Sequence, residues 1–167
     1  MGVENFAQQA KQNQIDGVLT VDMPIEQAEE VLATYKKFDL DNIFLVAPTT
    51  SQQRIKSICE HSSGFVYYVS LKGVTGAGNL DTTQVANKVS EIEQFSSLPV
   101  GVGFGIKDAE SATKVALIAD AVVVGSAIIR EIENHANDQV KMLKNIKTLL
   151  SDMRLAMDNA TCDKQVA

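Results

Sequence analysis

Residues 98–106 read Leu-Pro-Val-Gly-Val-Gly-Phe-Gly-Ile, and residues 121–129 read Ala-Val-Val-Val-Gly-Ser-Ala-Ile-Ile. Each stretch contains a short run of small and β-branched residues that ends in glycine and precedes a segment with helical character. Runs of this kind are typical of parallel strands that are buried on both faces. The two stretches therefore predict two consecutive strand–helix units, and the rest of the chain can be interpreted around them.

The glycines of these stretches lie where a strand ends and a helix is about to begin. A glycine there lets a ligand approach the backbone closely, and the free N–H groups at a helix N-terminus attract an anion such as phosphate. We expect Gly103, Phe104 and Gly105 to form one side of such a site, and Gly125 and Ser126 the other. Either group alone is better explained by a tight turn. Their occurrence on consecutive units favours a phosphate site, as in barrels that use the loops after strands seven and eight.

The remaining sequence repeats the alternation of helix and strand. Apolar residues at helical or β spacing, separated by turn residues, predict five strands and seven helices. The predicted strands span residues 18–21, 42–47, 65–71, 100–103 and 121–124. The predicted helices span residues 3–14, 25–38, 52–61, 82–95, 107–118, 127–133 and 139–157, and we expect residues 159–167 to form a frayed tail.

Strict alternation with short connections implies parallel strands joined by right-handed crossovers. We therefore predict an α/β fold with one domain over residues 1–158, a partial (β/α)8 TIM barrel of five parallel strands. The chain has 167 residues, which is shorter than the roughly 200 or more of a complete barrel. A doubly wound nucleotide-binding sheet is the alternative, but it needs Gly-x-Gly-x-x-Gly after the first strand, and this sequence has no such motif there.

Composition argues against several classes of function. A formal net charge of -6 opposes a nonspecific grip on nucleic acid. The longest apolar run, residues 112–129, is interrupted by Lys114, Asp120 and Gly125, which argues against a membrane span. Cys59 and Cys162 lie far apart without metal-ligand spacing, so we expect no metal site and two unpaired thiols in the reducing cytoplasm.

Residues 72–79 read Lys-Gly-Val-Thr-Gly-Ala-Gly-Asn, which is too rich in glycine for a strand or a helix. This loop follows a predicted strand, and barrel enzymes place substrate-covering lids at the carboxyl ends of their strands. An ordinary surface loop is the alternative, and the composition of the loop does not decide between the two.

Five segments, in this order and spacing, resemble the tryptophan synthase α chain family. They are Val-Leu-Thr-Val-Asp-Met-Pro at 18–24, Phe-Val-Tyr-Tyr-Val-Ser at 65–70, Gly-Val-Thr-Gly-Ala at 73–77, Gly-Phe-Gly-Ile at 103–106 and Gly-Ser-Ala-Ile at 125–128. The segment at 73–77 is specific, whereas the last two recur in several phosphate-binding barrels. The resemblance extends from about Gly2 to Met157.

The resemblance implies a barrel lyase of tryptophan biosynthesis that works in the cytoplasm. Members of the family split indole-3-glycerol phosphate by a retro-aldol reaction into indole and glyceraldehyde 3-phosphate. The indole passes to a β chain that carries pyridoxal phosphate, in an α2β2 heterotetramer. The resemblance therefore implies a β-chain partner and no cofactor in this chain.

The resemblance also implies roles for individual residues. Backbone N–H groups would bind the phosphate at Gly76, Gly105, Gly125 and Ser126, and Phe104 would line the same end. The indole pocket would be surrounded by Leu19, Val21, Leu45 and Tyr67. Thr75 would lie on the lid, where its hydroxyl positions a catalytic aspartate carried elsewhere.

The resemblance begins at the helix after the third strand of the family barrel, so three strand–helix units have no counterpart here. The glutamate general acid and base and the aspartate that holds the indole N–H belong to those units. Nothing in the sequence promotes Glu4, Asp22, Asp81 or Glu110 to replace them, because solvated caps and helix faces explain these residues. We therefore expect the isolated chain to bind its ligand weakly and to catalyse little.

Five of eight strands also leave two unpaired sheet edges, and exposed apolar edges usually find partners. The hypothesis is a truncated or incomplete α chain, which self-associates if it stands alone. A noncatalytic phosphate-binding or assembly module is the first alternative, and a barrel enzyme that acts on another sugar phosphate is the second.

Overall fold

The chain forms one sheet of five parallel strands in the computed structural model, which describes residues 1–70, 82–103 and 105–165. The strands are β1 (Gly17–Thr20), β2 (Asp41–Val46), β3 (Val66–Val69), β4 (Val100–Gly103) and β5 (Ala121–Val123). They lie in the order β1-β2-β3-β4-β5, and each pairs in parallel with the next strand along the chain. All five predicted strands are confirmed.

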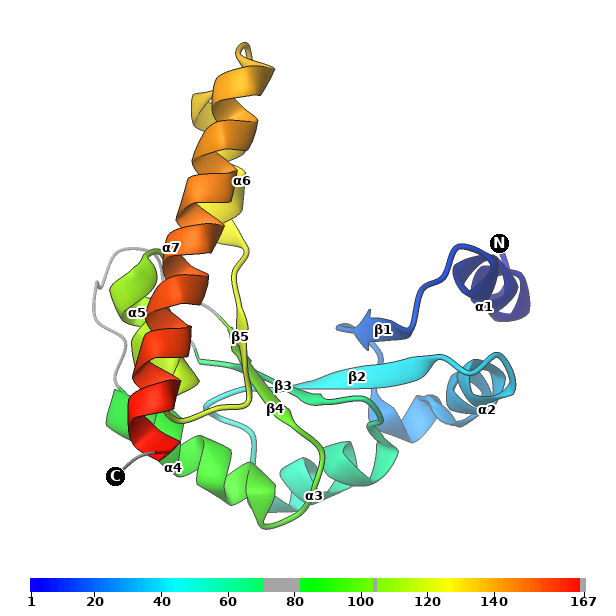
Figure 1. Ribbon diagram of the computed structural model, residues 1–167. Coiled ribbons are helices and arrows are strands. Elements are labelled where there is room, and N and C mark those ends of the chain that lie inside the picture. The colour runs from blue at the N-terminus through cyan, green and yellow to red at the C-terminus, as the bar shows by residue number, and fades with distance from the viewer. Residues whose placement is uncertain (71–81, 104, 166–167) are drawn as a thin grey trace.

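This strand order decides between the two predicted architectures. A doubly wound sheet reverses its strand order partway along the chain, whereas a barrel adds each strand beside the previous one. Here the order never reverses, so the partial barrel is confirmed. Figure 1 shows the sheet curving so that β1 and β5, its two edges, rise on the same side.

The helices alternate with the strands and lie on the convex side of the sheet. They are α1 (Val3–Gln12), α2 (Glu29–Lys37), α3 (Gln52–His61), α4 (Thr82–Glu93), α5 (Ala109–Ala116), α6 (Ser126–Asn134) and α7 (Gln139–Gln165), with a 3-10 turn, η1 (Ile25–Gln27), before α2. The single helix predicted over 25–38 is therefore divided, because η1 closes its tight turn with the Ala28 N–H bonded to the Ile25 carbonyl.

The last helix is longer than its sequence pattern indicated. We expected a frayed tail after Asp158, but α7 continues to Gln165, so residues 159–165 are helical. Arg154 forms an ion pair with Asp158, and the Thr161 hydroxyl donates a hydrogen bond to the Met157 carbonyl at 2.9 Å. Residues 158–165 contain no glycine or proline, so the turns continue beyond the apolar face that defined the predicted helix.

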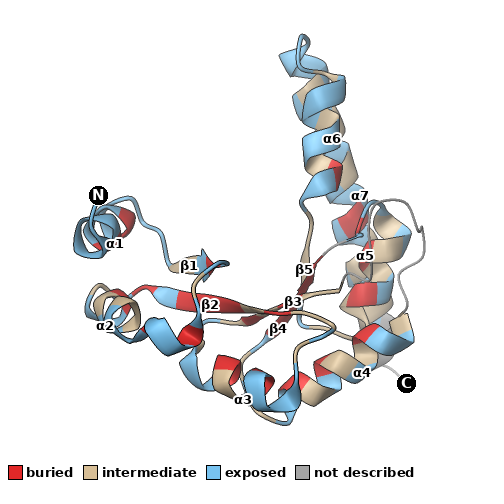
Figure 2. Cartoon of the chain, turned by 180° about the vertical axis from the view of Figure 1, so that it is seen from behind, coloured by how far each residue is buried: buried red, intermediate tan, exposed pale blue. Residues whose placement is uncertain are grey.

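The core lies between the sheet and its helices. One face of each inner strand points toward α3, α4 and α5, whose sheet-facing sides are buried (Figure 2). The strand residues of this core are Phe44, Val46, Val66, Tyr68, Val100 and Val102. Their helix partners include Ile55, Ile58, Val85, Val89, Ile92, Ala112 and Val115, with Met153 of α7. Burial of each such side chain stabilises the fold by about 1.5–3 kcal/mol.

The opposite, concave face carries the alternate strand residues. Register pairs Leu19 with Ile43, and Leu45 with Tyr67, so these four side chains share that face. Leu19 is 47% exposed, although it lies in the middle of a strand. No helix in the described part of the chain is long and apolar enough to cross a membrane.

Candidate functional site

A hollow of about 180 Å³ lies at the carboxyl ends of β3, β4 and β5. Its lining consists of Tyr67, Gly105, Ile106, Val123, Gly125 and Ser126. Four of these, Tyr67, Gly105, Gly125 and Ser126, are residues that the sequence predicted for the ligand site. The hollow is smaller than the roughly 300–1,000 Å³ of a complete small-molecule pocket, so it corresponds to one end of a site.

Both glycines of the hollow leave its backbone accessible. Gly105 has a φ of 79°, a left-handed conformation that favours glycine, and a Cβ added there would meet nothing within 4 Å. A Cβ added at Gly125 would likewise meet nothing within 4 Å. A ligand can therefore approach the peptide N–H groups of both turns without meeting a side chain.

The N-terminus of α6 is open toward a ligand. Gly125 occupies its N-cap position, and no side chain caps the helix. The first N–H groups of an α-helix have no partner within the helix, and the helix dipole makes that end attractive to anions. Because Gly125 and Ser126 line the hollow, the start of α6 offers these N–H groups to an anion bound there.

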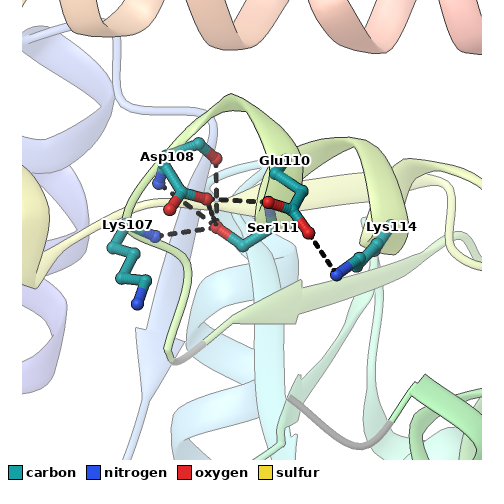
Figure 3. A network of polar contacts seen from close by, with 5 residues as sticks. All are labelled: Lys107, Asp108, Glu110, Ser111 and Lys114. Atoms are coloured by element: carbon teal, nitrogen blue, oxygen red, sulfur yellow. Dashed lines mark hydrogen bonds and ion pairs between the residues drawn. The ribbon is translucent and has the colours of Figure 1, made fainter. Parts of the chain in front are cut away.

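The N-terminus of α5 is different, because its own side chains already occupy it (Figure 3). The Asp108 carboxylate accepts a hydrogen bond from the Ser111 N–H at 2.8 Å, and the Ser111 hydroxyl accepts one from the Asp108 N–H at 3.2 Å. The bonds from Ser111 hold the pKa of Asp108 below its ordinary value, so this carboxylate is charged at neutral pH. The start of α5 therefore already carries an anion of its own.

Tyr67 forms the wall of the hollow on the β3 side. Its hydroxyl lies only 2.1 Å from where a Cβ on Gly103 would stand, so the ring lies across Gly103. The Ser70 hydroxyl donates to the Gly103 carbonyl at 3.0 Å, which joins the ends of β3 and β4. Burial raises the pKa of the Tyr67 phenol, which therefore stays protonated and able to donate a hydrogen bond.

The sequence did not single out Ile106 or Val123, which also line the hollow. Val123 lies opposite Gly103 in the register of β4 and β5, so it faces the same side as Tyr67. The period-two pattern of the strands contained this signal. Ile106 is buried directly after Gly105, and its position depends on the turn that Gly105 makes.

The residues expected around the indole lie mostly outside the hollow. Leu45 is half-buried beside Tyr67 in the sheet, whereas Leu19 is two strands away from Tyr67 on the same face. Val21 follows the end of β1 and is 60% exposed. The structure thus aligns Leu19, Leu45 and Tyr67 on the concave face but does not gather them into one pocket. Thr75, Gly76 and Phe104 lie outside the described residues.

The described lining of the hollow contains no carboxylate. Glu4 pairs with Lys37 at 2.5 Å and Glu110 with Lys114 at 2.6 Å, both on the surface. Asp22 is exposed, and Asp81 lies outside the described residues. Where the chain is described, no group of three His, Cys, Asp or Glu side chains is placed to hold a metal ion. The arrangement can hold an anion and a flat apolar group, but its described groups supply no acid or base at that place.

A family model described as tryptophan synthase alpha chain matches residues 1–158. The chain is 51% identical over 158 residues to the tryptophan synthase alpha chain of Nitrosococcus oceani, a match that covers 95% of this chain and 58% of the relative. It is 48% identical over 159 residues to that of Marinobacter nauticus, with 95% and 59% covered. The chain thus spans less than two thirds of the length of these relatives.

Solved structures agree with this likeness. The tryptophan synthase subunit alpha of Legionella pneumophila superimposes with a TM-score of 0.81 at 39% identity, covering 95% of this chain and 58% of that one. A chain from the tryptophan synthase a2b2 complex of Pyrococcus furiosus superimposes with a TM-score of 0.79 at 31% identity, covering 91% and 60%. The five strands therefore curve as the corresponding part of a complete barrel does.

Proposed function

Because the chain belongs to the tryptophan synthase alpha chain family, we propose that it forms the phosphate-holding part of a lyase that splits indole-3-glycerol phosphate into indole and glyceraldehyde 3-phosphate. The observation that carries this proposal is the hollow in which Gly105, Gly125 and Ser126 meet at the open start of α6. A phosphate ester bound there receives backbone N–H groups and the positive end of a helix dipole.

The rest of the substrate extends from the phosphate along the concave face of the sheet. Tyr67 borders the hollow and is followed on that face by Leu45, which gives the indole ring an apolar surface beside the phosphate. Leu19 and Val21 extend the same surface toward β1. Gly76 and Phe104 add to the phosphate end in this proposal, and Thr75 acts on the lid.

The retro-aldol step needs a proton donor and acceptor at the indole ring, and geometry limits which groups can serve. Since no carboxylate lines the described hollow, the acid–base groups come from residues outside this sequence in our proposal. The chain binds and orients the substrate, and turnover requires the remaining part of the barrel.

We further propose a β chain as partner, in an assembly of α2β2 type, where the partner carries pyridoxal phosphate. The likeness to a chain of the Pyrococcus furiosus a2b2 complex supports this partner. Cys59 and Cys162 are both unpaired thiols, as expected in the reducing cytoplasm, where we place the assembly.

A second candidate is a phosphate-binding or assembly module without catalysis. The absence of a carboxylate from the described lining of the hollow favours it for the isolated chain. In isolation the unpaired edges of β1 and β5 also favour self-association of the chain.

Calorimetric titration with indole-3-glycerol phosphate, together with an assay for released indole, tests the proposal. We expect saturable binding without indole release by this chain alone. Release of indole would show that the chain has its own acid and base, and would contradict the role given to the missing units. The absence of binding to both indole-3-glycerol phosphate and inorganic phosphate would contradict the proposed site.

A further inference from the structure

The large apolar side chains that remain exposed gather at the two ends of the chain. Among the described residues, every one of them lies either between residues 1 and 21 or between residues 129 and 155. The first group is Met1, Val3, Phe6, Ile15, Leu19 and Val21. The second group is Ile129, Ile132, Val140, Leu143, Leu150 and Leu155. The helices between them, α2 to α5, expose none in their described residues, so the two groups are not a general property of this surface.

Each group lies beside one unpaired edge of the sheet. The first belongs to α1, β1 and the residues around them, next to the edge that β1 forms. The second belongs to α6 and α7, which follow β5 at the other edge and project from the sheet together (Figure 1). Apolar surface that borders a free strand edge is typical of an interaction site.

The backbone of both edges can accept another parallel strand. The Asp41 N–H bonds to the Asp16 carbonyl at 2.8 Å, so even-numbered residues of β1 bond to β2. The N–H of Leu19 therefore points to the open edge. At the other end the Asp120 N–H bonds to the Val100 carbonyl at 3.1 Å, so the N–H of Ala121 points outward.

The curvature of the sheet sets the width of what fits between these edges. The chain superimposes on alpha-chain barrels with a TM-score of 0.81, and it covers 58% of their length. Five strands with this curvature leave room for the three that complete an eight-stranded barrel, at about 4.8 Å per strand. A second copy of this chain would bring five strands and would have to flatten the sheet.

We propose that the edges of β1 and β5, together with the exposed apolar side chains of α1, α6 and α7, form one divided docking surface. Its occupant is a polypeptide of three parallel strand–helix units, which pairs with both edges at once and covers both apolar groups. This inference rests on the fold and on the position of exposed side chains, and it is independent of the ligand proposed for the hollow.

The test combines this chain with a second polypeptide, the part of the Nitrosococcus oceani alpha chain that this chain does not match. Light scattering measures the mass of the mixture, and hydrogen exchange measures the protection of backbone N–H groups. We expect a complex of one chain with one partner, formed at the expense of any self-associated chain. The N–H groups of Leu19 and Ala121 gain protection together, because one partner covers both edges.

Two pairs of variants separate the docking surface from general effects of charge. Ile129→Lys and Leu143→Lys place a charge on side chains that are 53% and 56% exposed, and together they should weaken the complex at least tenfold. Gln53→Lys and Asn87→Lys add the same charge on exposed positions of α3 and α4, and they should leave it unchanged. Circular dichroism melting shows whether each variant is folded.

Ala121→Pro tests the edge itself, since proline removes an N–H that points away from β4 and keeps the pairing of β4 with β5. It should also weaken the complex at least tenfold. The proposal is wrong if the mixture stays unassociated, if only one edge gains protection, or if a stable dimer of this chain excludes the partner. All these measurements are made without ligand, so their failure is distinguishable from failure of the proposed phosphate site.

Discussion

Two helices of this chain begin at the same end of the sheet, and they begin in opposite ways. Helix α5 starts with a capping box, in which the charged Asp108 carboxylate occupies its N-terminus. Helix α6 starts at Gly125 with no side-chain cap and with open space in front of it. Both satisfy the polar groups of a helix start in a way that proteins commonly use, one by a side chain and one by a ligand or water.

The difference teaches where an anion can bind. A carboxylate already placed at α5 repels a second anion, whereas the start of α6 offers its N–H groups and dipole to one. The sequence suggested both turns as sides of a phosphate site. The structure divides their roles: Gly105 contributes an open loop backbone, and α6 contributes the helix N-terminus.

The largest expected effect comes from making α6 like α5. Gly125→Asp places a carboxylate at the N-cap, where it accepts the N–H groups that the phosphate would use. We expect the affinity for inorganic phosphate to fall at least tenfold, while the free energy of unfolding changes by only a few tenths of a kcal/mol. Calorimetric titration and thermal melting measure the two quantities.

Gly2→Asp is the matched control, because Gly2 is also an uncapped glycine N-cap with nothing within 4 Å of its added Cβ. It adds the same charge at α1, far from the hollow along the sheet, and should leave phosphate binding unchanged. Equal loss of affinity in both variants would mean that net charge, and not the start of α6, governs binding.

The next effect separates the two ends of the proposed substrate. Gly103→Ala places a Cβ 2.1 Å from the Tyr67 hydroxyl, so the ring must move. We expect the free energy of unfolding to fall by about 1–3 kcal/mol, as in other overpacked sites. The affinity for indole-3-glycerol phosphate should fall more than that for inorganic phosphate, since Tyr67 borders the apolar part.

Gly101→Ala provides the comparison for that variant. Its added Cβ would stand 3.1 Å from the Phe65 ring, which needs to shift by only a few tenths of an ångström. We expect a smaller loss of stability and no preferential loss of indole-3-glycerol phosphate. If the two alanine variants behave alike, the contact between Tyr67 and Gly103 does not shape the site.

A smaller effect is expected at the helix that is already capped. Asp108→Ala removes the carboxylate that accepts the Ser111 N–H, which costs about 1 kcal/mol of stability. Asp108→Asn retains an acceptor and should lose less. Chemical denaturation measures both losses. Phosphate affinity should not fall in either variant, and a fall would place the binding site at α5.

The smallest effect is a pH dependence of stability. The pKa of Asp108 is lower in the folded chain than its ordinary value, because the charged form accepts bonds from Ser111. Its contribution is therefore present above the unfolded pKa of about 4 and is lost as pH falls through the lower folded pKa. Denaturation at pH 6 and pH 3 should show a smaller decrease in Asp108→Asn than in the natural chain; an equal decrease would remove Asp108 from the acid response.

Much of the fold followed from local patterns. Runs such as 100–103 and 121–123 are short and rich in small and β-branched residues, and strict alternation with helices determines a parallel sheet with neighbouring strands in chain order. The meeting of Gly105, Gly125 and Ser126 was predictable for the same reason, because neighbouring parallel strands end at one edge of the sheet.

Other features depend on relations between distant segments. The contact of Tyr67 with Gly103 requires the register that pairs Tyr67 with Gly101, and register is a property of two strands together. The cap at α5 had only a weak local signal, because Ser111 stands three residues after Asp108, where a capping box usually has Glu or Gln. The continuation of α7 after Asp158 lacks an apolar periodicity and depends on i,i+4 contacts instead.

The most direct test of the phosphate site is a titration with inorganic phosphate followed by the backbone N–H signals in nuclear magnetic resonance. We predict that Gly105, Gly125, Ser126 and Ala127 shift together along one saturation curve, while Ala109, Glu110 and Ser111 at the start of α5 do not. Saturable shifts at the start of α5, or no saturable shift at Gly125 and Ser126, would contradict the central claim that the open start of α6 holds the phosphate.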